Sequence, residues 1–159
     1  MPHEALRATE AAAWMRKAAD DLRGSQVDLD ASPPLIEDSL FHSQQAVEKA
    51  LKAFLTWHNT PFRKVHDLSE LGELCVGVDA GLDAFCRRAE KLTVFATVFR
   101  YPGNYDAPPR EEAIEALEIA RGFRDNPLAL ASAGRFCDPL KHNTPAQSVS
   151  GCCRYDCIG

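Results

Sequence analysis

Apolar residues recur every three or four positions from about residue 4 to about residue 124, and this spacing is typical of helices that each bury one face. The first such stretch covers about residues 4–23, and its apolar positions are Ala11, Trp14, Met15, Ala18 and Leu22. The segment GSQVDLDASPPLIED follows and contains a glycine, acidic residues and a Pro pair. These residues predict a turn, so we expect the first helix to end near Arg23.

A second helical stretch covers about residues 35–57. Its apolar positions fall within a sector of about 100° on a helical wheel. They are Leu40, Val47, Leu51, Phe54 and Leu55. His42, Gln45 and Lys49 lie together on the opposite side of the wheel. Lys52 lies on their flank, and we call these four residues the polar stripe.

Two helices are expected next. The third begins near Asp67 or Ser69, either of which can cap it. Its apolar positions are Leu68, Leu71, Leu74, Cys75 and Val78. The fourth covers about residues 82–100, and its near-heptad apolar seam suits an antiparallel neighbour. The seam positions are Leu82, Phe85, Ala89, Leu92, Ala96 and Phe99.

The segment YPGNYDAPP ends the fourth helix, because its Pro and Gly residues cannot continue it. A fifth helix is expected over about residues 110–124, with Ala113, Ile114, Leu117 and Ala120 inward. No stretch alternates with a period of two for long enough to require a strand, so we predict an all-α domain of residues 1–128. Helical periodicity is lost beyond it, and residues 129–159 are expected to form an irregular or disordered tail.

Composition narrows the class of protein. A chain of 159 residues with 45% apolar and 26% charged residues is typical of one soluble globular domain. A net charge of −5 argues against broad binding to duplex nucleic acid, although a local cationic site stays compatible with it. The N-terminus is too charged for a signal peptide and no apolar run approaches about 20 residues, so we expect a cytoplasmic protein.

Cysteine usage adds little chemistry. In the cytoplasm the six cysteines are expected to be reduced. The cysteines of the tail lack the paired spacing of a zinc knuckle, so we expect no metal and no cofactor. Glu48 and Lys52 have the spacing of an intrahelical ion pair, while Asp20 and Asp21 point in different directions and one of them can pair with a base across the bundle.

Several stretches together resemble the HEPN family of small helical bundles. They follow Trp14 in the expected order and read AADDL, FHSQQAVEKALKAFL, HDLSEL, FRYPGNYDAP and EEAIEALEIA. The resemblance implies an antiparallel up-and-down bundle of four to five helices, often dimeric, whose members bind nucleotides or RNA. It also implies that the protein acts together with a minimal nucleotidyltransferase, as part of a toxin–antitoxin pair. Catalytic members are metal-independent endoribonucleases that use an Arg followed about four to six residues later by a His.

Here the motif is incomplete. Arg100 is followed by YPGNYDAPPRE, and the next histidine is His142. A tyrosine with an ordinary pKa of about 10 is a poor base at neutral pH, so Tyr101 and Tyr105 do not replace that histidine. The sequence therefore favours binding over catalysis. The candidate ligand-binding residues are His42, Gln45, Lys49, Lys52, His66, Arg100 and Tyr105.

These residue types suit a phosphate group. Arg100 offers a guanidinium fork, the two lysines offer ammonium groups, and His66 lies where the third helix exposes backbone N–H groups. We predict a nucleotide- or RNA-binding module that is homodimeric and acts with a minimal nucleotidyltransferase. Three alternatives stay open. The protein cleaves RNA with Arg100 and either His42 or His66, the polar stripe is a dimer surface of a structural protein, or the stripe is simply solvated.

Overall fold

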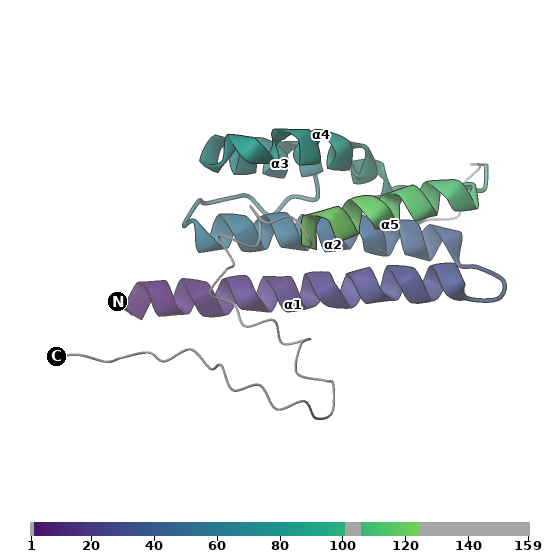
Figure 1. The fold of residues 1–159 in the computed structure, drawn as a ribbon, viewed down its shortest axis with the longest axis horizontal. Coiled ribbons are helices and arrows are strands. Elements are labelled where there is room, and N and C mark those ends of the chain that lie inside the picture. Colours follow the sequence, from purple (N-terminus) through teal and green to yellow (C-terminus); the bar gives the residue numbers. More distant parts are fainter. Residues whose placement is uncertain (1, 101–105, 125–159) are drawn as a thin grey trace, which may run out of the picture.

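The computed structural model describes residues 2–100 and 106–124 (Figure 1). Its α-helices are α1 (Pro2–Asp30), α2 (Ile36–Trp57), α3 (Leu68–Val78), α4 (Asp83–Glu90) and α5 (Arg110–Arg124). Three short 3₁₀ helices are η1 (Ala80–Leu82), η2 (Lys91–Ala96) and η3 (Val98–Arg100). No strand occurs in these ranges, so the predicted all-α bundle is confirmed.

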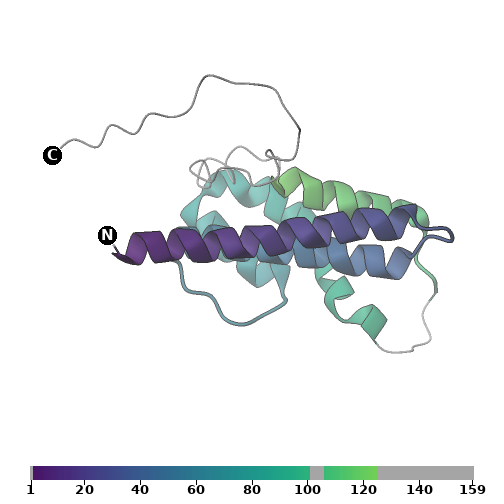
Figure 2. The same ribbon diagram turned by 90° about the horizontal axis from the view of Figure 1, so that it is seen from below.

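The helices form three layers with α2 in the centre. Figure 1 shows α1 and α2 as two long antiparallel helices joined by one turn, with α5 beside α2 and the α3–α4 pair on the far side from α1. In the view from below, α1 lies in front, with α2 along one side of it and α5 along the other (Figure 2). Because α2 packs against α1, α3, α5 and η2, very little of its circumference is left for solvent.

The first helix is longer than the sequence predicts. It continues through Gly24 to Asp30, so the expected end near Arg23 is wrong. The extra turns bury Leu29 and the hydroxyl of Ser25 against α2, and this packing outweighs the low helix propensity of a single glycine. A Cβ at Gly24 would lie 3.4 Å from Cγ of His42, an ordinary van der Waals contact, so the packing of α1 on α2 does not require a glycine there.

The predicted length of the fourth helix is also wrong. Only Asp83–Glu90 is α-helical, and the chain then continues in the 3₁₀ helices η2 and η3. The buried positions of this stretch are Cys86, Ala89, Leu92, Phe95 and Ala96, and the first four are three residues apart. A 3₁₀ helix has three residues per turn, so the tighter winding keeps the later apolar side chains on the buried side.

The remaining boundaries agree closely with the sequence. Asp67 caps α3 by accepting a 2.8 Å hydrogen bond from the Ser69 backbone N–H. In α5 the expected inward position of Ile114 is wrong, since that residue is 39% exposed. The inner side of α5 is instead completed by Ala116, Ile119 and Phe123.

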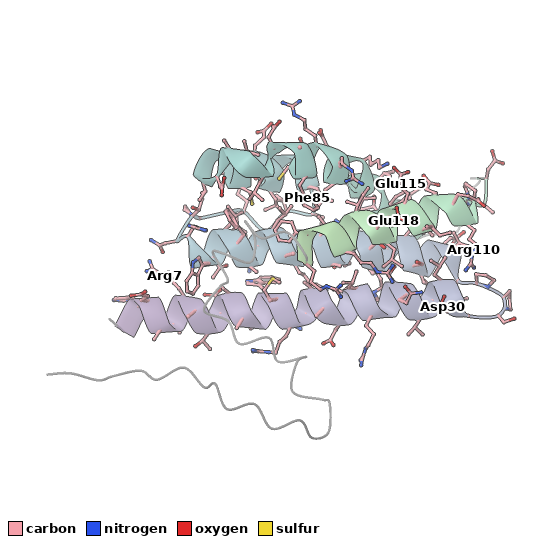
Figure 3. All side chains as sticks on the ribbon, in the orientation of Figure 1. Arg7, Asp30, Phe85, Arg110, Glu115 and Glu118 are labelled. Carbon is pink, nitrogen blue, oxygen red and sulfur yellow. The ribbon has the colours of Figure 1, made fainter. Side chains whose placement is uncertain are left out.

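Figure 3 shows how side chains join the layers. Phe85 of α4 packs on Phe123 of α5 with ring centroids 4.8 Å apart. Arg110 reaches from the start of α5 to the end of α1, where its Nη1 donates a 2.9 Å hydrogen bond to the Leu29 carbonyl. None of the described helices is long and apolar enough to cross a bilayer.

Candidate functional site

The polar stripe of α2 faces α1. The exposed fractions of the stripe's cationic side chains are 8% for Lys52, 21% for Lys49 and 35% for His42. The interpretation as a solvated face is therefore wrong. The alternative of a dimer surface fails for the same reason, because α1 of the same chain already covers this side of α2.

One polar cluster joins the middle of α2 to the C-terminal half of α1. Asp21 accepts a hydrogen bond from Lys49 Nζ, and its Oδ1 lies 3.1 Å from Nδ1 of His42. Nε2 of the same imidazole lies 3.8 Å from Oδ2 of Asp28. We call these four residues the Asp21 cluster. Its presence confirms that one of the two adjacent aspartates pairs with a base across the bundle.

Asp28 is the least satisfied member of this cluster. Its Oδ2 is buried and accepts no hydrogen bond from any described residue. Burial raises the pKa of Asp28, the positive field of His42 opposes that rise, and the nearby Asp38 adds to it. The ionised carboxylate of Asp28 is therefore held in the folded state at a cost in free energy.

A second cluster surrounds Glu48, whose side chain is 4% exposed. The carboxylate accepts hydrogen bonds from Lys52 Nζ at 2.7 Å and from Gln44 Nε2 at 3.0 Å. Nδ1 of His66 lies 3.2 and 3.1 Å from the two carboxylate oxygens. Gln45 donates to Oε1 of Gln44 at 2.7 Å and thereby orients that amide. We call these five residues the Glu48 cluster.

Opposing effects act on the Glu48 carboxyl. Burial raises its pKa, but hydrogen bonds from Lys52 and Gln44, the charge of Lys52 and the contact with His66 together lower it below the ordinary value of 4.5. The predicted Glu48–Lys52 ion pair is thus confirmed, as a buried pair. The Lys52 ammonium also lies 5.5 Å from the ring centroid of Trp14 in α1.

His66 is the exposed member of the Glu48 cluster. Its side chain is 57% exposed, and its backbone carbonyl accepts a 3.2 Å hydrogen bond from Gln44 Nε2. The first N–H groups of α3 are already occupied, because Leu68 donates to Thr93 Oγ1 at 3.1 Å and Ser69 donates to Asp67. The expectation that free N–H groups at this helix start would bind an anion is therefore not supported.

The structure thus divides the predicted ligand-binding residues. His42 and Lys49 belong to the Asp21 cluster, whereas Gln45, Lys52 and His66 belong to the Glu48 cluster. Tyr105 lies outside the described residues. Arg100 ends η3, and its side chain also lies outside them.

Sequence reasoning overlooked the carboxylates as organisers of the site. Asp21 and Glu48 each receive donors from residues far apart in sequence, and the helical wheel gave neither of them a role beyond one ion pair. The available signal was Glu48 itself, an acidic residue between Val47 and Lys49 in a helix with apolar neighbours at 47, 50 and 51. Among the described residues, no group of three or more His, Cys, Asp or Glu side chains could hold a metal ion.

Comparison of the chain with models of known protein families shows one match. The model of the HEPN domain matches residues 11–127, which is most of the chain. The chain belongs to the HEPN family. The match begins at Ala11, the first buried residue of α1, and none of residues 3–10 is buried. No curated protein and no solved structure matches the chain. HEPN membership supports a role related to nucleotides or RNA in general terms.

Proposed function

We propose that this HEPN domain binds a nucleotide or an RNA phosphate at the surface that carries His66. One observation carries the proposal. The imidazole of His66 is about half exposed, and its Nδ1 contacts the buried carboxylate of Glu48. An imidazole held in this way loses little conformational freedom when a ligand arrives, which favours binding.

Arg100 is the second proposed contact. The hydrogen bond from the Leu68 N–H to Thr93 ties the start of α3 to η2, and the chain runs from η2 through η3 to Arg100. This connection supports the proposal that Arg100 adds a guanidinium to the same phosphate. Tyr105, further along the same segment, is proposed as a neighbouring contact.

The lysines receive a different role in this proposal. Lys49 and Lys52 are already paired with Asp21 and Glu48, so a phosphate would have to compete with an internal carboxylate for each ammonium group. We therefore propose that these lysines, together with His42 and Gln45, stabilise the site by internal contacts and do not bind the ligand directly.

The binding proposal is tested by titrating the full chain with ATP and with a short single-stranded RNA. Losing one hydrogen-bonding contact to phosphate should weaken binding by about 10- to 100-fold in His66→Ala and in Arg100→Ala. Arg23→Ala is the matched control, since its side chain is 81% exposed on α1 and should leave the affinity unchanged. Absence of saturable binding, or equal affinity in all variants, would remove the proposal.

We further propose that the domain is a homodimer and acts with a minimal nucleotidyltransferase in a toxin–antitoxin system. Family membership is the support for both statements. Analytical ultracentrifugation of the purified chain tests the first. Co-purification with a nucleotidyltransferase encoded by an adjacent reading frame, and relief of growth inhibition by it, tests the second. A monomer, or a chain that inhibits no growth and captures no such enzyme, contradicts them.

A further inference from the structure

The turn between α1 and α2 carries exposed apolar residues at one end of the bundle (Figure 1). Val27, in the last turn of α1, is 62% exposed, and Leu35, just before α2, is 47% exposed. The Leu35 N–H donates a 2.8 Å hydrogen bond to the carbonyl of Asp28, which brings Leu35 beside the turn that carries Val27. Pro33 and Pro34 are exposed as well. We call Val27, Pro33, Pro34 and Leu35 the apolar tip.

The stability of the fold does not explain Leu35. This residue occupies the N-cap position of α2, and no side chain of a described residue caps that helix start. Ser, Thr, Asp and Asn stabilise an N-cap, whereas Leu35 supplies no cap and leaves almost half of its surface in water. A residue that breaks a local rule without a gain for the fold marks a place where a functional contact is expected.

Acidic residues surround the apolar tip. Asp30 ends α1 and Asp38 lies in the first turn of α2, and both are exposed. Glu111 and Glu112, in the first turn of α5, are exposed too. Arg110 holds this start of α5 against the end of α1, and Figure 3 shows Arg110 and Asp30 at the same end of the bundle. We call Asp30, Asp38, Glu111 and Glu112 the acidic rim.

Helix electrostatics account for only part of this charge. Carboxylates in the first turns of α2 and α5 lie at the positive end of each helix dipole and stabilise those helices. Asp30 lies at the negative end of α1, whose last turn contains no basic residue. An acidic residue at that end lowers the stability of its helix, so the position of Asp30 favours a role in recognition.

We propose that the apolar tip and the acidic rim bind a partner protein, through a segment whose apolar side chains are flanked by lysines or arginines. An apolar centre with a polar rim is the usual arrangement of a protein–protein interface. Positive charge on the partner is complementary to the rim. The same carboxylates would repel a nucleic acid or an anionic membrane, and a second copy of the chain would place like charges against each other. Charge complementarity therefore selects a basic protein segment.

The apolar tip is separate from the surface proposed for phosphate. Glu48, which contacts His66, lies more than three turns of α2 beyond Leu35, roughly 20 Å along the helix axis. A partner at the tip leaves His66 accessible. The docking proposal thus does not depend on nucleotide binding.

The test uses the full chain and two fluorescent peptides that form amphipathic helices, one made of Leu and Lys and the other of Leu and Glu. Fluorescence anisotropy at low salt should show saturable binding of the Leu–Lys peptide only. Leu35→Ser and Val27→Ser should each weaken this binding by about tenfold, because each removes an apolar contact. Leu6→Ser is the matched control, since Leu6 is 65% exposed near the other end of α1 and its variant should bind like wild type.

Further measurements separate charge from folding. Glu111→Gln/Glu112→Gln should weaken binding by about three- to tenfold at low salt, and the difference from wild type should disappear at high salt. Glu118→Gln, an exposed residue further along α5, is the control for this variant. Serine is a preferred N-cap residue, so Leu35→Ser should not lower the midpoint of thermal unfolding. Its loss of binding then cannot be assigned to a damaged fold.

A photoreactive group on the Leu–Lys peptide locates the contact. Crosslinks confined to residues 27–38 and the first turn of α5 support the proposal. Crosslinks elsewhere, equal binding of the Leu–Glu peptide, or absence of saturable binding overturns it. Self-association of wild type that is lost in Leu35→Ser, measured by sedimentation, would also overturn it, because the tip would then be a contact between copies. The affinity of Leu35→Ser for ATP should equal that of wild type, so failure at the tip is distinguishable from failure at the phosphate surface.

Discussion

The two sides of α2 are built from different chemistry. Toward α1 it presents Ser39, Ser43, His42, Lys49 and Lys52, which meet hydroxyl, carboxylate and aromatic groups of the neighbouring helix. Its remaining circumference carries Leu40, Val47, Leu51 and Leu55, none of which exposes any surface, and among them the buried polar pair Gln44 and Glu48. Apolar burial supplies most of the free energy of folding but has no direction, whereas hydrogen bonds specify which atoms must meet.

We interpret the polar side as the device that sets the register of the two long helices. At one end, the Ser25 hydroxyl lies 3.0 Å from that of Ser39 and 2.8 Å from that of Ser43. The Asp21 cluster lies in the middle of the α1–α2 interface. At the other end of the interface, the Lys52 ammonium lies over the ring of Trp14. Sliding α1 by one turn would break all of these contacts together, since each requires one particular partner.

The largest expected effect comes from breaking the buried ion pair. Glu48→Leu leaves the Lys52 ammonium buried without a counter-charge and should lower the free energy of unfolding by about 3–5 kcal/mol in urea denaturation. The double variant Glu48→Leu/Lys52→Leu should lose less than this single variant. The exposed pair of the same spacing, Asp83–Arg87, is the control, and Arg87→Ala should cause no measurable change. A double variant worse than Glu48→Leu would contradict our interpretation of the pair.

A smaller effect distinguishes two aspartates on one face of α1. Asp21→Asn weakens the contacts to Lys49 and His42 and should cost about 1.5–3 kcal/mol of unfolding free energy. Asp28→Asn should instead raise it by up to about 1 kcal/mol at pH 7, because folding raises the pKa of Asp28 and its ionised form destabilises the fold.

The stabilisation expected from Asp28→Asn should depend on pH. Below the ordinary pKa of 3.8 the carboxyl is protonated in both the folded and unfolded states, so the penalty is absent. It appears as the pH rises through the higher pKa of the folded state. The gain from Asp28→Asn should therefore vanish in acid. A gain that persists below pH 3.8 would show that charge is not its cause.

Two helical glycines compare the packing on the two sides of α2. A Cβ at Gly72 would lie 3.0 Å from Cβ of Cys86 in the apolar layer, so Gly72→Ala should cost about 1–2 kcal/mol of unfolding free energy. A Cβ at Gly24 would meet the His42 ring at an ordinary 3.4 Å, so Gly24→Ala should gain roughly 0.5–1 kcal/mol from helix propensity. Thermal unfolding of both variants compares the packing of the two sides directly. Equal losses would mean that the α1–α2 interface is as tightly packed as the apolar layer.

Much of the fold could be predicted where the local signals agree. The bounds of α2, α3 and α5 follow from strong apolar stripes and, for α3, from the cap at Asp67. The end of α1 could not, because Ser25 and Leu29 extend the helix only when α2 is present to bury them. The change from α4 to η2 likewise depends on how the layer beneath receives Leu92 and Phe95.

The candidate site was predicted in its residues but not in its connections. The sequence grouped Lys49 and Lys52 as one source of positive charge, and the structure separates them into two clusters with their own carboxylates. His42 and His66 were equivalent candidates on the sequence, and they differ because one lies between α1 and α2 while the other is exposed at a loop. A wheel for one helix contains no information about the helix that covers it.

By itself, the sequence determined an all-α chain, the apolar positions of most helices and the resemblance to the HEPN family, because these depend on spacing along one segment. Only the tertiary structure decided that the polar stripe is an interior interface, that Asp21 and Glu48 organise it, and that the exposed side chain of His66 contacts Glu48 through Nδ1. The physical reason is that a hydrogen bond between helices depends on their relative rotation and register. Those quantities are set by the packing of the whole bundle and by no single segment.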